Sequence, residues 1–240
     1  MARSRRRKAK STRRISGKVL IACGLLALAG VAALLAWEKA RHWRPDETRW
    51  PDQGAILGER DGFVNFSALK GLGAKLVYLE ASHGAGRQDA RFPANLAAAR
   101  SAGLEVGAVH EFDPCVPADR QSANFVTVVP RDSSLLPPVI LMDRTAEDCP
   151  TRVFDAAVQS ELMTLVNQIE AHAGKEVILS PSEGFDQAYG ISSRVRRNLW
   201  LTRPFLEPAY GARPWVMWTA NPIMATEASD HPLRWMVVQP

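Results

Sequence analysis

The sequence predicts an α/β barrel preceded by one N-terminal transmembrane helix. Three observations lead to this prediction: a long uncharged segment near the N-terminus, an alternation of strand and helix patterns after it, and three closing strand patterns with little helix between them. Alternating strands and helices are typical of a parallel sheet with right-handed crossovers. Eight strands with helices between only the first five indicate a barrel that finishes irregularly.

The length of 240 residues allows one domain of about 190 residues and an appendage. We expect four segments along the chain: a basic cytoplasmic tail at 1–18, a transmembrane signal anchor at 19–37, a linker at 38–53 and a barrel domain at 54–240. The chain is therefore predicted to hold a single folded domain.

The positive charge of the chain is concentrated at its N-terminus. Residues 1–18 carry nine of the 30 Lys and Arg residues and no acidic residue, which leaves 21 basic against 25 acidic residues and a net charge of −4 for the remainder. A nucleic-acid-binding domain would carry its basic residues on the folded part. The charge pattern therefore argues against a nucleic-acid partner.

Residues 19–37 form a 19-residue uncharged segment, which is long enough to cross a bilayer as a helix. Basic residues precede it, and Trp37 and Trp43 lie where an interfacial belt is expected. We interpret it as a signal anchor that holds the protein in the bacterial inner membrane by a single pass, with the C-terminal domain in the periplasm. A cleaved signal peptide is the alternative.

Eight strands are expected from short apolar runs that end at polar or glycine-containing turns. They lie at 54–58, 75–80, 104–110, 136–143, 175–180, 199–202, 215–219 and 233–239. The fourth of these opens with two prolines and ends at Asp143. Since side chains two apart on a strand share a face, Leu141 and Asp143 point the same way, toward the C-terminal rim where barrel chemistry occurs.

Five helices are expected between and after these strands, at 65–71, 92–102, 117–129, 155–173 and 185–189. The segment 155–173 is the strongest, because its apolar residues recur at helical spacing and Gly174 provides a stop. The segment 92–102 repeats alanine and leucine and ends before Gly103, which suits a helix C-terminus.

Four pieces of the chain follow one another at 77–84, 102–112, 121–125 and 136–139. Together they resemble glycoside hydrolase family 25, the lysozymes (N-acetylmuramidases) that cleave the glycan of peptidoglycan, and the resemblance spans about residues 54–218. It implies a flattened TIM-like β/α barrel with five βα units and three extra strands.

The catalytic motifs of this family are altered in the chain. Where the resemblance places an aspartate on the first strand the sequence has Ile56, and where it places Asp-x-Glu on the fourth strand the sequence has Leu141-Met142-Asp143. Val109 replaces an aromatic residue, and the aspartate expected near the C-terminus has no clear counterpart. The resemblance therefore implies a degenerate active site with a shortened acid at Asp143.

The candidate site residues follow from this pattern. Asp143 is the candidate catalytic acid, and the alternative is a strand-end aspartate held by a hydrogen bond or an arginine. His110, Glu80 and Trp218 are candidates for substrate binding, although a single histidine at a strand end is more often a packed core residue. Glu80, Glu111 and Glu183 also lie near strand ends, where they could rebuild an unfamiliar site.

The remaining signals are weaker. The tryptophans Trp200, Trp215, Trp218 and Trp235 either form a sugar-stacking wall or are buried in the last strands. His83, His110, Cys115 and Cys149 have no recognised metal-ligand spacing, and the sequence has neither a phosphate-binding loop nor a nucleophile elbow. We therefore expect no metal and no cofactor.

Two functions from different classes remain open. The first is a membrane-tethered, catalytically impaired lysozyme-like protein that binds peptidoglycan glycan or a protein partner. The second is a weak or altered muramidase that uses Asp143 as its acid. The first is favoured because several carboxylates are absent and not only one.

A disulfide is expected between Cys115 and Cys149. These residues lie five and six positions past His110 and Asp143, in the loops that leave the third and fourth strands. Neighbouring parallel strands release their exit loops on the same rim, which allows the Cα separation that a disulfide needs. A periplasmic location would supply the oxidant.

Overall fold

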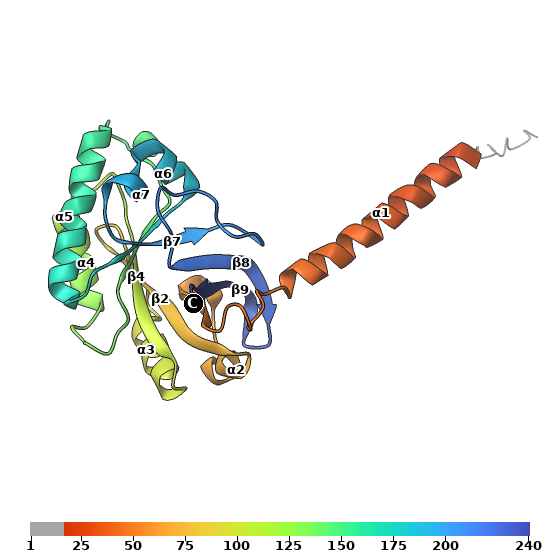
Figure 1. Cartoon of the computed structure of the whole chain (residues 1–240), viewed down its shortest axis with the longest axis horizontal. Helices are drawn as coiled ribbons and strands as arrows, with labels where there is room; N and C mark the ends of the chain where they lie inside the picture. The colour runs from red at the N-terminus through yellow and green to blue at the C-terminus, as the bar shows by residue number, and fades with distance from the viewer. Residues whose placement is uncertain (1–16) are drawn as a thin grey trace, which may run out of the picture. The chain divides into compact units, whose positions relative to one another are not determined.

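The structure, a computed structural model, describes residues 17–240 (Figure 1). The basic tail predicted at 1–18 therefore lies almost wholly outside the described residues. The chain divides after Ala40 into two compact units, of which the second runs from Arg41 to Pro240.

The first unit is described as one helix, α1 (Gly17–Arg41), built from the residues with the highest helix propensity, alanine and leucine. Its described side chains between residues 21 and 39 are exposed. The part from Ile21 to Arg41 has 21 residues with a mean hydropathy of 2.0, which is long and apolar enough to cross a membrane. A signal sequence near the N-terminus has the same properties.

The second unit is a closed barrel, as the sequence predicts. Its ring runs β1–β2–β4–β5–β6–β7–β8–β9 and returns to β1. The strands are β1 (Gln53–Leu57), β2 (Ala74–His83), β4 (Glu105–Glu111), β5 (Val139–Met142), β6 (Ile178–Pro181), β7 (Asn198–Thr202), β8 (Met217–Thr226) and β9 (Ser229–Val238). Every predicted strand is present, and a two-residue strand, β3 (Arg87–Gln88), pairs with the end of β2.

Neighbouring strands of the ring are parallel from β1 through β8. The last strand, β9, is antiparallel to both β8 and β1, because a tight turn joins it directly to β8 without a crossover helix. The barrel therefore closes through a hairpin, which is the irregular finish that the strand and helix pattern indicates.

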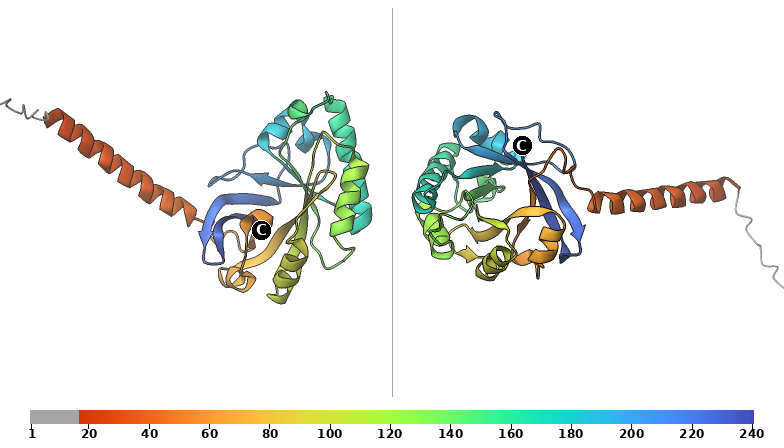
Figure 2. Two further views of the ribbon diagram at one scale, coloured as in Figure 1. Left: turned by 180° about the vertical axis from the view of Figure 1, so that it is seen from behind. Right: turned by 60° about the horizontal axis from the view of Figure 1, so that its bottom comes forward.

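Helices surround one side of the barrel (Figures 1 and 2). They are α2 (Phe66–Gly71), α3 (Phe92–Ser101), α4 (Ala118–Val128), α5 (Asp155–Ala173), α6 (Glu183–Tyr189) and α7 (Ile191–Arg194), with 3-10 turns at Glu59–Asp61 and Ala146–Asp148. The five predicted helices are confirmed. The helix α7 and the two 3-10 turns were not predicted, since elements of three or four residues carry no periodic pattern.

Two helix ends show why these boundaries were predictable. Gly174 has φ = 68° in the left-handed region and closes α5, and its amide donates to the carbonyl of Glu170 at 2.8 Å. Gly103, with φ = 73°, does the same after α3. A residue with a Cβ is strained in this conformation, which is why glycine is frequent there.

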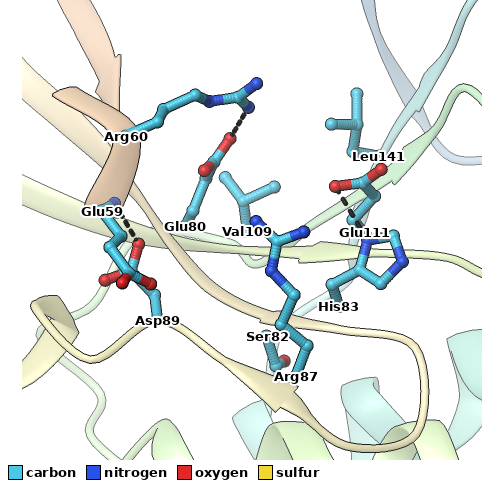
Figure 3. Close-up of a pocket in the computed structure, with 10 residues that line it drawn as sticks. All are labelled: Glu59, Arg60, Glu80, Ser82, His83, Arg87, Asp89, Val109, Glu111 and Leu141. Carbon is cyan, nitrogen blue, oxygen red and sulfur yellow. Dashed lines mark hydrogen bonds and ion pairs between the residues drawn. The ribbon is translucent and has the colours of Figure 1, made fainter.

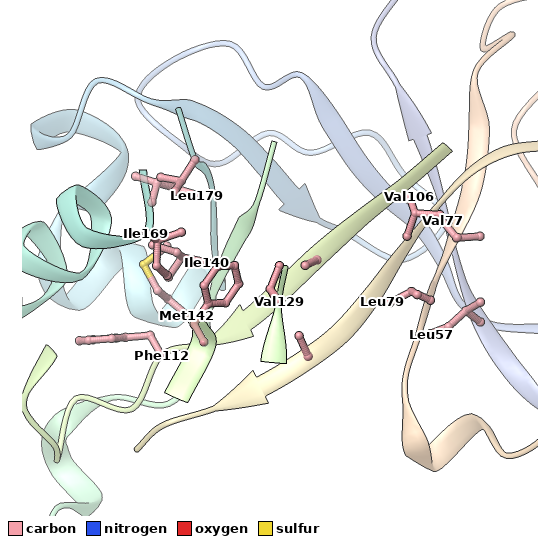
Figure 4. Close-up of a cluster of buried hydrophobic side chains, with 14 of the residues drawn as sticks. Leu57, Val77, Leu79, Val106, Phe112, Val129, Ile140, Met142, Ile169 and Leu179 are labelled. Atoms are coloured by element: carbon pink, nitrogen blue, oxygen red, sulfur yellow. The ribbon is translucent and has the colours of Figure 1, made fainter. Parts of the chain in front are cut away.

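The apolar core has two layers, because successive strand residues face opposite sides of the sheet. Val77 and Leu79 of β2 face outward and join the layer between strands and helices, which Figure 4 shows with Ile140, Met142 and Ile169. The inner layer fills the barrel itself. It consists of Leu76, Tyr78, Val109, Val139, Ile178, Trp200, Met217 and Met236.

Residues 41–53, which the sequence predicts as part of a linker, are packed on the barrel. Trp50 is 4% exposed and stacks on Trp215 with ring centroids 5.6 Å apart. The side-chain amide of Gln53 donates to the carbonyls of Pro45 and Trp50, both at 2.9 Å. The burial of Trp50 stabilises the packing of this segment on the barrel although most of its residues are polar. The compact unit therefore begins at Arg41.

Candidate functional site

A cavity of about 350 Å³ opens at the C-terminal ends of the parallel strands. This is the end of a β/α barrel where active sites are found. Its floor is apolar and its rim is polar. The floor consists of Ile56, Val109, Val139, Leu141 and Trp200, and the rim includes Arg60, Glu111, Asp143, Ser180, Ser182, Glu183, Thr202, Thr219 and Arg234.

The floor carries no carboxylate. Ile56 comes from β1, Val109 from β4 and Leu141 from β5, and all three face the inside of the barrel. Trp200 is 1% exposed, and its indole N–H donates to Oγ1 of Thr219 at 2.8 Å. The floor is therefore an apolar surface that can pack against a ligand but cannot exchange a proton with it.

Asp143 lies directly after β5 and lines the cavity. Its side chain is exposed. Its backbone carbonyl accepts a hydrogen bond from the hydroxyl of Ser182 at 3.5 Å. Asp143 is therefore accessible to a ligand and to water.

Glu80, from β2, is held beside the cavity by two arginines, of which Figure 3 shows Arg60. Its Oε1 contacts Nη2 of Arg234 at 2.8 Å and also pairs with Arg60. Its Oε2 occupies the space beside Gly58, where a Cβ would lie 2.1 Å from that oxygen. Glu80 is thus fixed by two ion pairs, and the absence of a side chain at Gly58 makes room for its carboxylate.

Asp61 adds a second acid to this group. Its carboxylate lies 3.8 Å from Nη2 of Arg234 and accepts a hydrogen bond from the backbone N–H of Gly58 at 2.7 Å. Burial raises the pKa of Asp61 above its ordinary value, against the opposing effects of the Gly58 hydrogen bond and Arg234. Two acids, Glu80 and Asp61, and two arginines, Arg60 and Arg234, therefore form one cluster of ion pairs at the barrel mouth.

A second ion pair joins His83 of β2 to Glu111 of β4 (Figure 3). His83 Nδ1 lies 3.0 Å from Oε2 of Glu111. The contact with Glu111 raises the pKa of His83, and the same contact lowers the pKa of Glu111. At neutral pH Glu111 is therefore a carboxylate whose orientation is set by His83.

His110 does not face the cavity, which corrects its assignment as a ligand-contacting residue. It is fully buried, its Nδ1 lies 2.8 Å from the hydroxyl of Ser82, and its Nε2 lies 3.3 Å from Oε1 of Gln121. Burial lowers its pKa to about 4. Because Glu111 faces the cavity, its neighbour His110 must face the helix layer, where it is a neutral core residue.

Trp218 also lies away from the cavity, which corrects its assignment to substrate binding. It is 3% exposed, and its indole N–H donates to the carbonyl of Arg203 at 2.9 Å. It packs against Trp43 and Trp50 outside the barrel. Of the four tryptophans that the sequence offered as a sugar-stacking wall, Trp200 is the one that lines the cavity.

The structure contains the predicted disulfide between Cys115 and Cys149, with Cα atoms 5.3 Å apart. It joins the loops that follow β4 and β5. The same loops are linked by Arg144, whose guanidinium contacts Asp113 at 3.5 Å and donates to the carbonyl of Asp148 at 2.9 Å. The segment that carries Asp143 is therefore held from both sides.

Several residues of the site were not singled out as site residues from the sequence. Arg60, Arg234 and His83 owe their positions to partners far away in the chain, and no local pattern indicates such a partner. Arg234 gave one usable signal, since it is a charge inside an otherwise apolar strand. Among residues 17–240, no group of three or more His, Cys, Asp or Glu side chains is placed to hold a metal ion.

The fold and the position of the cavity define a β/α barrel with its site at the C-terminal rim. A family model described as "Glycosyl hydrolases family 25" matches residues 57–220, and the chain belongs to this family. The resemblance drawn from the sequence is thereby confirmed. Comparison with curated protein sequences gives no match.

Solved structures of the same family share the fold. A family 25 glycosyl hydrolase from Bacillus anthracis has a TM-score of 0.74 at 23% identity, covering 83% of this chain and 93% of that one. A bacterial lysozyme from Streptomyces coelicolor has a TM-score of 0.71 at 18% identity, covering 79% and 92%. A family GH25 lysozyme from Aspergillus fumigatus has a TM-score of 0.64 at 17% identity, covering 79% and 94%.

Proposed function

We propose that this protein is a membrane-anchored member of family 25 that is directed at peptidoglycan but impaired in glycan cleavage. It acts by binding glycan strands or a protein partner. The observation that carries the proposal is the apolar floor of the cavity, where Ile56 and Leu141 occupy the two positions at which the family resemblance expects aspartates.

Glycoside cleavage needs a proton donor at the leaving oxygen and a second group that stabilises the positive centre or activates water. Asp143 is one methylene shorter than the glutamate expected there, and a misplacement of about 1 Å can reduce the rate on the order of a hundredfold. Loss of electrostatic stabilisation removes about 3 kcal/mol or more. The family reaction should therefore be slow.

Binding has better support from the same cavity. Its volume of about 350 Å³ falls within the range of ligand pockets, which combine apolar walls with a few polar groups. The apolar floor can pack against the C–H faces of a sugar ring. The serine, threonine and charged side chains of the rim can bond its hydroxyl groups.

Membrane anchoring is supported by the apolar part of α1 and by the basic residues that precede it. The excess of positive charge before the span favours a cytoplasmic N-terminus and a periplasmic barrel. The disulfide agrees with an oxidising compartment. A reporter fused after Pro240 tests the orientation, and activity restricted to the cytoplasm would contradict it.

The test of function uses the full chain in detergent with purified peptidoglycan sacculi. We expect the protein to sediment with the sacculi and to release reducing ends far more slowly than an active family 25 lysozyme. A Leu141→Trp variant, which fills the cavity, should lose binding. Leu206→Trp is the matched control, because Leu206 is 58% exposed on a loop outside the cavity.

Two results would contradict this proposal. One is sedimentation that is equally strong for the Leu141→Trp variant and the wild type. The other is rapid release of reducing ends that Asp143→Asn abolishes, which would favour the second candidate, a working muramidase with Asp143 as its acid. That candidate is supported by the exposure of Asp143 at the cavity rim.

A further inference from the structure

The outer side of β8 is covered by two irregular segments, residues 42–52 and residues 203–216. Tryptophans from both segments pack there with Trp218 of β8. Trp43 comes from the first segment, and its ring meets Trp218 at 6.3 Å and Phe205 of the second segment at 5.8 Å. Trp43 and Phe205 therefore belong to one region of the barrel surface, although they are distant in the sequence.

The second segment holds a strained turn at Phe205. Its φ of 64° lies in the left-handed region, and among residues 17–240 Phe205 is the one non-glycine residue with a positive φ. Such a conformation is unfavourable, and strain of this kind often accompanies a functional site. The backbone N–H of Phe205 donates to the carbonyl of Ala220 at 2.7 Å. The guanidinium of Arg203 donates to the carbonyl of Glu207 at 3.0 Å, so the turn is held from both sides.

The turn exposes an apolar side chain among charged ones. Leu206 directly follows Phe205 and is 58% exposed. Arg203 is also exposed, and Arg49 of the first segment, which is 64% exposed, pairs with Glu207 at 2.8 Å. An apolar residue flanked by arginines suits a segment at a membrane surface, because the apolar part inserts and the cations interact with anionic lipids.

The chain keeps this turn close to the end of α1. The apolar part of α1, Ile21–Arg41, has 21 residues and is about 32 Å long as a helix, which matches a hydrocarbon core about 30 Å thick. A helix that spans the bilayer in this way ends at its surface. Trp43 follows Arg41 by two residues, which reach about 7 Å at most. Whatever direction α1 takes, the contact of Trp43 with Phe205 therefore keeps the turn near the bilayer.

We propose that residues 203–207 dock on the phospholipid bilayer, with Leu206 inserted among the headgroups and the exposed arginines beside anionic phosphates. The inference rests on the proposed membrane anchoring of the chain. One leucine binds a bilayer weakly by itself, but α1 makes the contact intramolecular and gives it a high effective concentration. In detergent, where no bilayer is present, Leu206 has no such partner.

Docking of the turn limits the distance between the bilayer and the cavity. Thr202 lines the cavity, and Phe205 follows it by three residues, which span at most about 11 Å. The barrel mouth therefore stays close to the membrane surface. The glycan that reaches the cavity is then the part of the peptidoglycan nearest to the membrane.

The experiment reports on the surroundings of position 206 in the full chain. Cys23, the free cysteine, is replaced by alanine, and Leu206→Cys is labelled with the environment-sensitive fluorophore NBD. The protein is reconstituted into vesicles of phosphatidylethanolamine and phosphatidylglycerol, with and without brominated acyl chains. We expect a blue-shifted emission and quenching by the brominated lipids. Quenching by aqueous iodide should fall by about half or more, since an inserted apolar residue is buried about 5–10 Å into the headgroup and acyl boundary.

Phe154→Cys is the matched control. Phe154 is an apolar residue with 63% exposure and lies directly before α5, which Figure 1 shows on the opposite side of the barrel from β8 and β9. Its label should stay accessible to iodide and unaffected by brominated lipids. A second reporter, a label on Ala209→Cys, keeps Leu206 in place, because Ala209 is an exposed residue of the same segment. Its shielding from iodide should be lost when Leu206→Asp is added.

Three results would overturn the inference. The first is iodide quenching at position 206 as strong as at position 154, and the second is shielding at position 209 that survives Leu206→Asp. The third is shielding in detergent that grows with protein concentration, which would assign the turn to contact with a second copy of the chain.

Alkaline carbonate extraction distinguishes failure of docking from failure of the anchor. If the protein stays in the vesicles after extraction while position 206 remains accessible to iodide, the inference fails and the proposed anchoring stands. If carbonate releases the protein, the proposed anchoring fails as well.

Discussion

Removing the side chain of Trp50 tests whether residues 41–53 belong to the folded domain. Trp50 is 4% exposed, stacks on Trp215 at 5.6 Å and meets Trp218 edge-on at 6.0 Å. Truncating such a tryptophan to alanine removes its transfer free energy and leaves a cavity, which lowers the free energy of unfolding by about 3–5 kcal/mol. For a domain of this size the melting temperature should fall by about 6–20 °C.

The assay is thermal and urea unfolding of the full chain in detergent, followed by near-ultraviolet circular dichroism of the aromatic cluster. Leu206→Ala is the control, because its side chain is 58% exposed and its loss should change stability by about 0.5 kcal/mol or less. A Trp50→Ala variant that loses under about 1 kcal/mol would refute the reasoning. It would mean that the segment is a free linker, as the sequence first indicates.

Three further predictions concern stability. Replacing both cysteines of the disulfide by serine should lower the free energy of unfolding by about 4 kcal/mol, the chain-entropy value for a loop with a sequence separation of 34; an unchanged urea midpoint would contradict this. Burial lowers the pKa of His110 to about 4 from 6.5, so the unfolded chain takes up this proton first as the pH falls. His110 should therefore reduce stability by about 3 kcal/mol between pH 6.5 and 4, and urea titrations of His110→Gln should lack that part of the decline. Glu80→Gln leaves the largely buried Arg234 without its main anion and should lower stability by about 2 kcal/mol. Glu207→Gln, whose partner is a 64% exposed arginine, should lower it by less than about 1 kcal/mol in the same unfolding measurement.

Local pattern predicted the framework of the fold well. The helix α5 covers Asp155–Ala173, the predicted range, because one apolar face and a glycine stop are both visible in the sequence. Strand positions followed from apolar runs in the same way. The hairpin between β8 and β9 was less visible, since the apolar runs at 215–219 and 233–239 cover only part of these two ten-residue strands and do not reveal their direction.

The site was harder to predict, because it depends on which face of a strand each side chain lies on and on ion-pair partners that are distant in the sequence. A strand reverses its facing side with every residue, so His110 and Glu111 differ by one position and yet face opposite layers. The ion pair of Glu80 and Arg234 joins residues more than 150 positions apart. The charged residues themselves can be recognised in the sequence. Their partners cannot, because the closure of the barrel brings the two residues together.

The free-energy cost of burying an unpaired charge accounts for two features of the site, the apolar floor and the ion pairs at the mouth. An ionised carboxylate on the floor would lose hydration and would need compensating bonds, whereas Ile56 and Leu141 lower the free energy of the folded barrel by packing on their neighbours. At the mouth, Glu80 pairs with Arg234 and Glu111 pairs with His83. Stability and activity often oppose each other in this way at active sites. This arrangement of an apolar floor under a charged rim is the physical basis of our proposal that the cavity binds a ligand and cleaves it slowly.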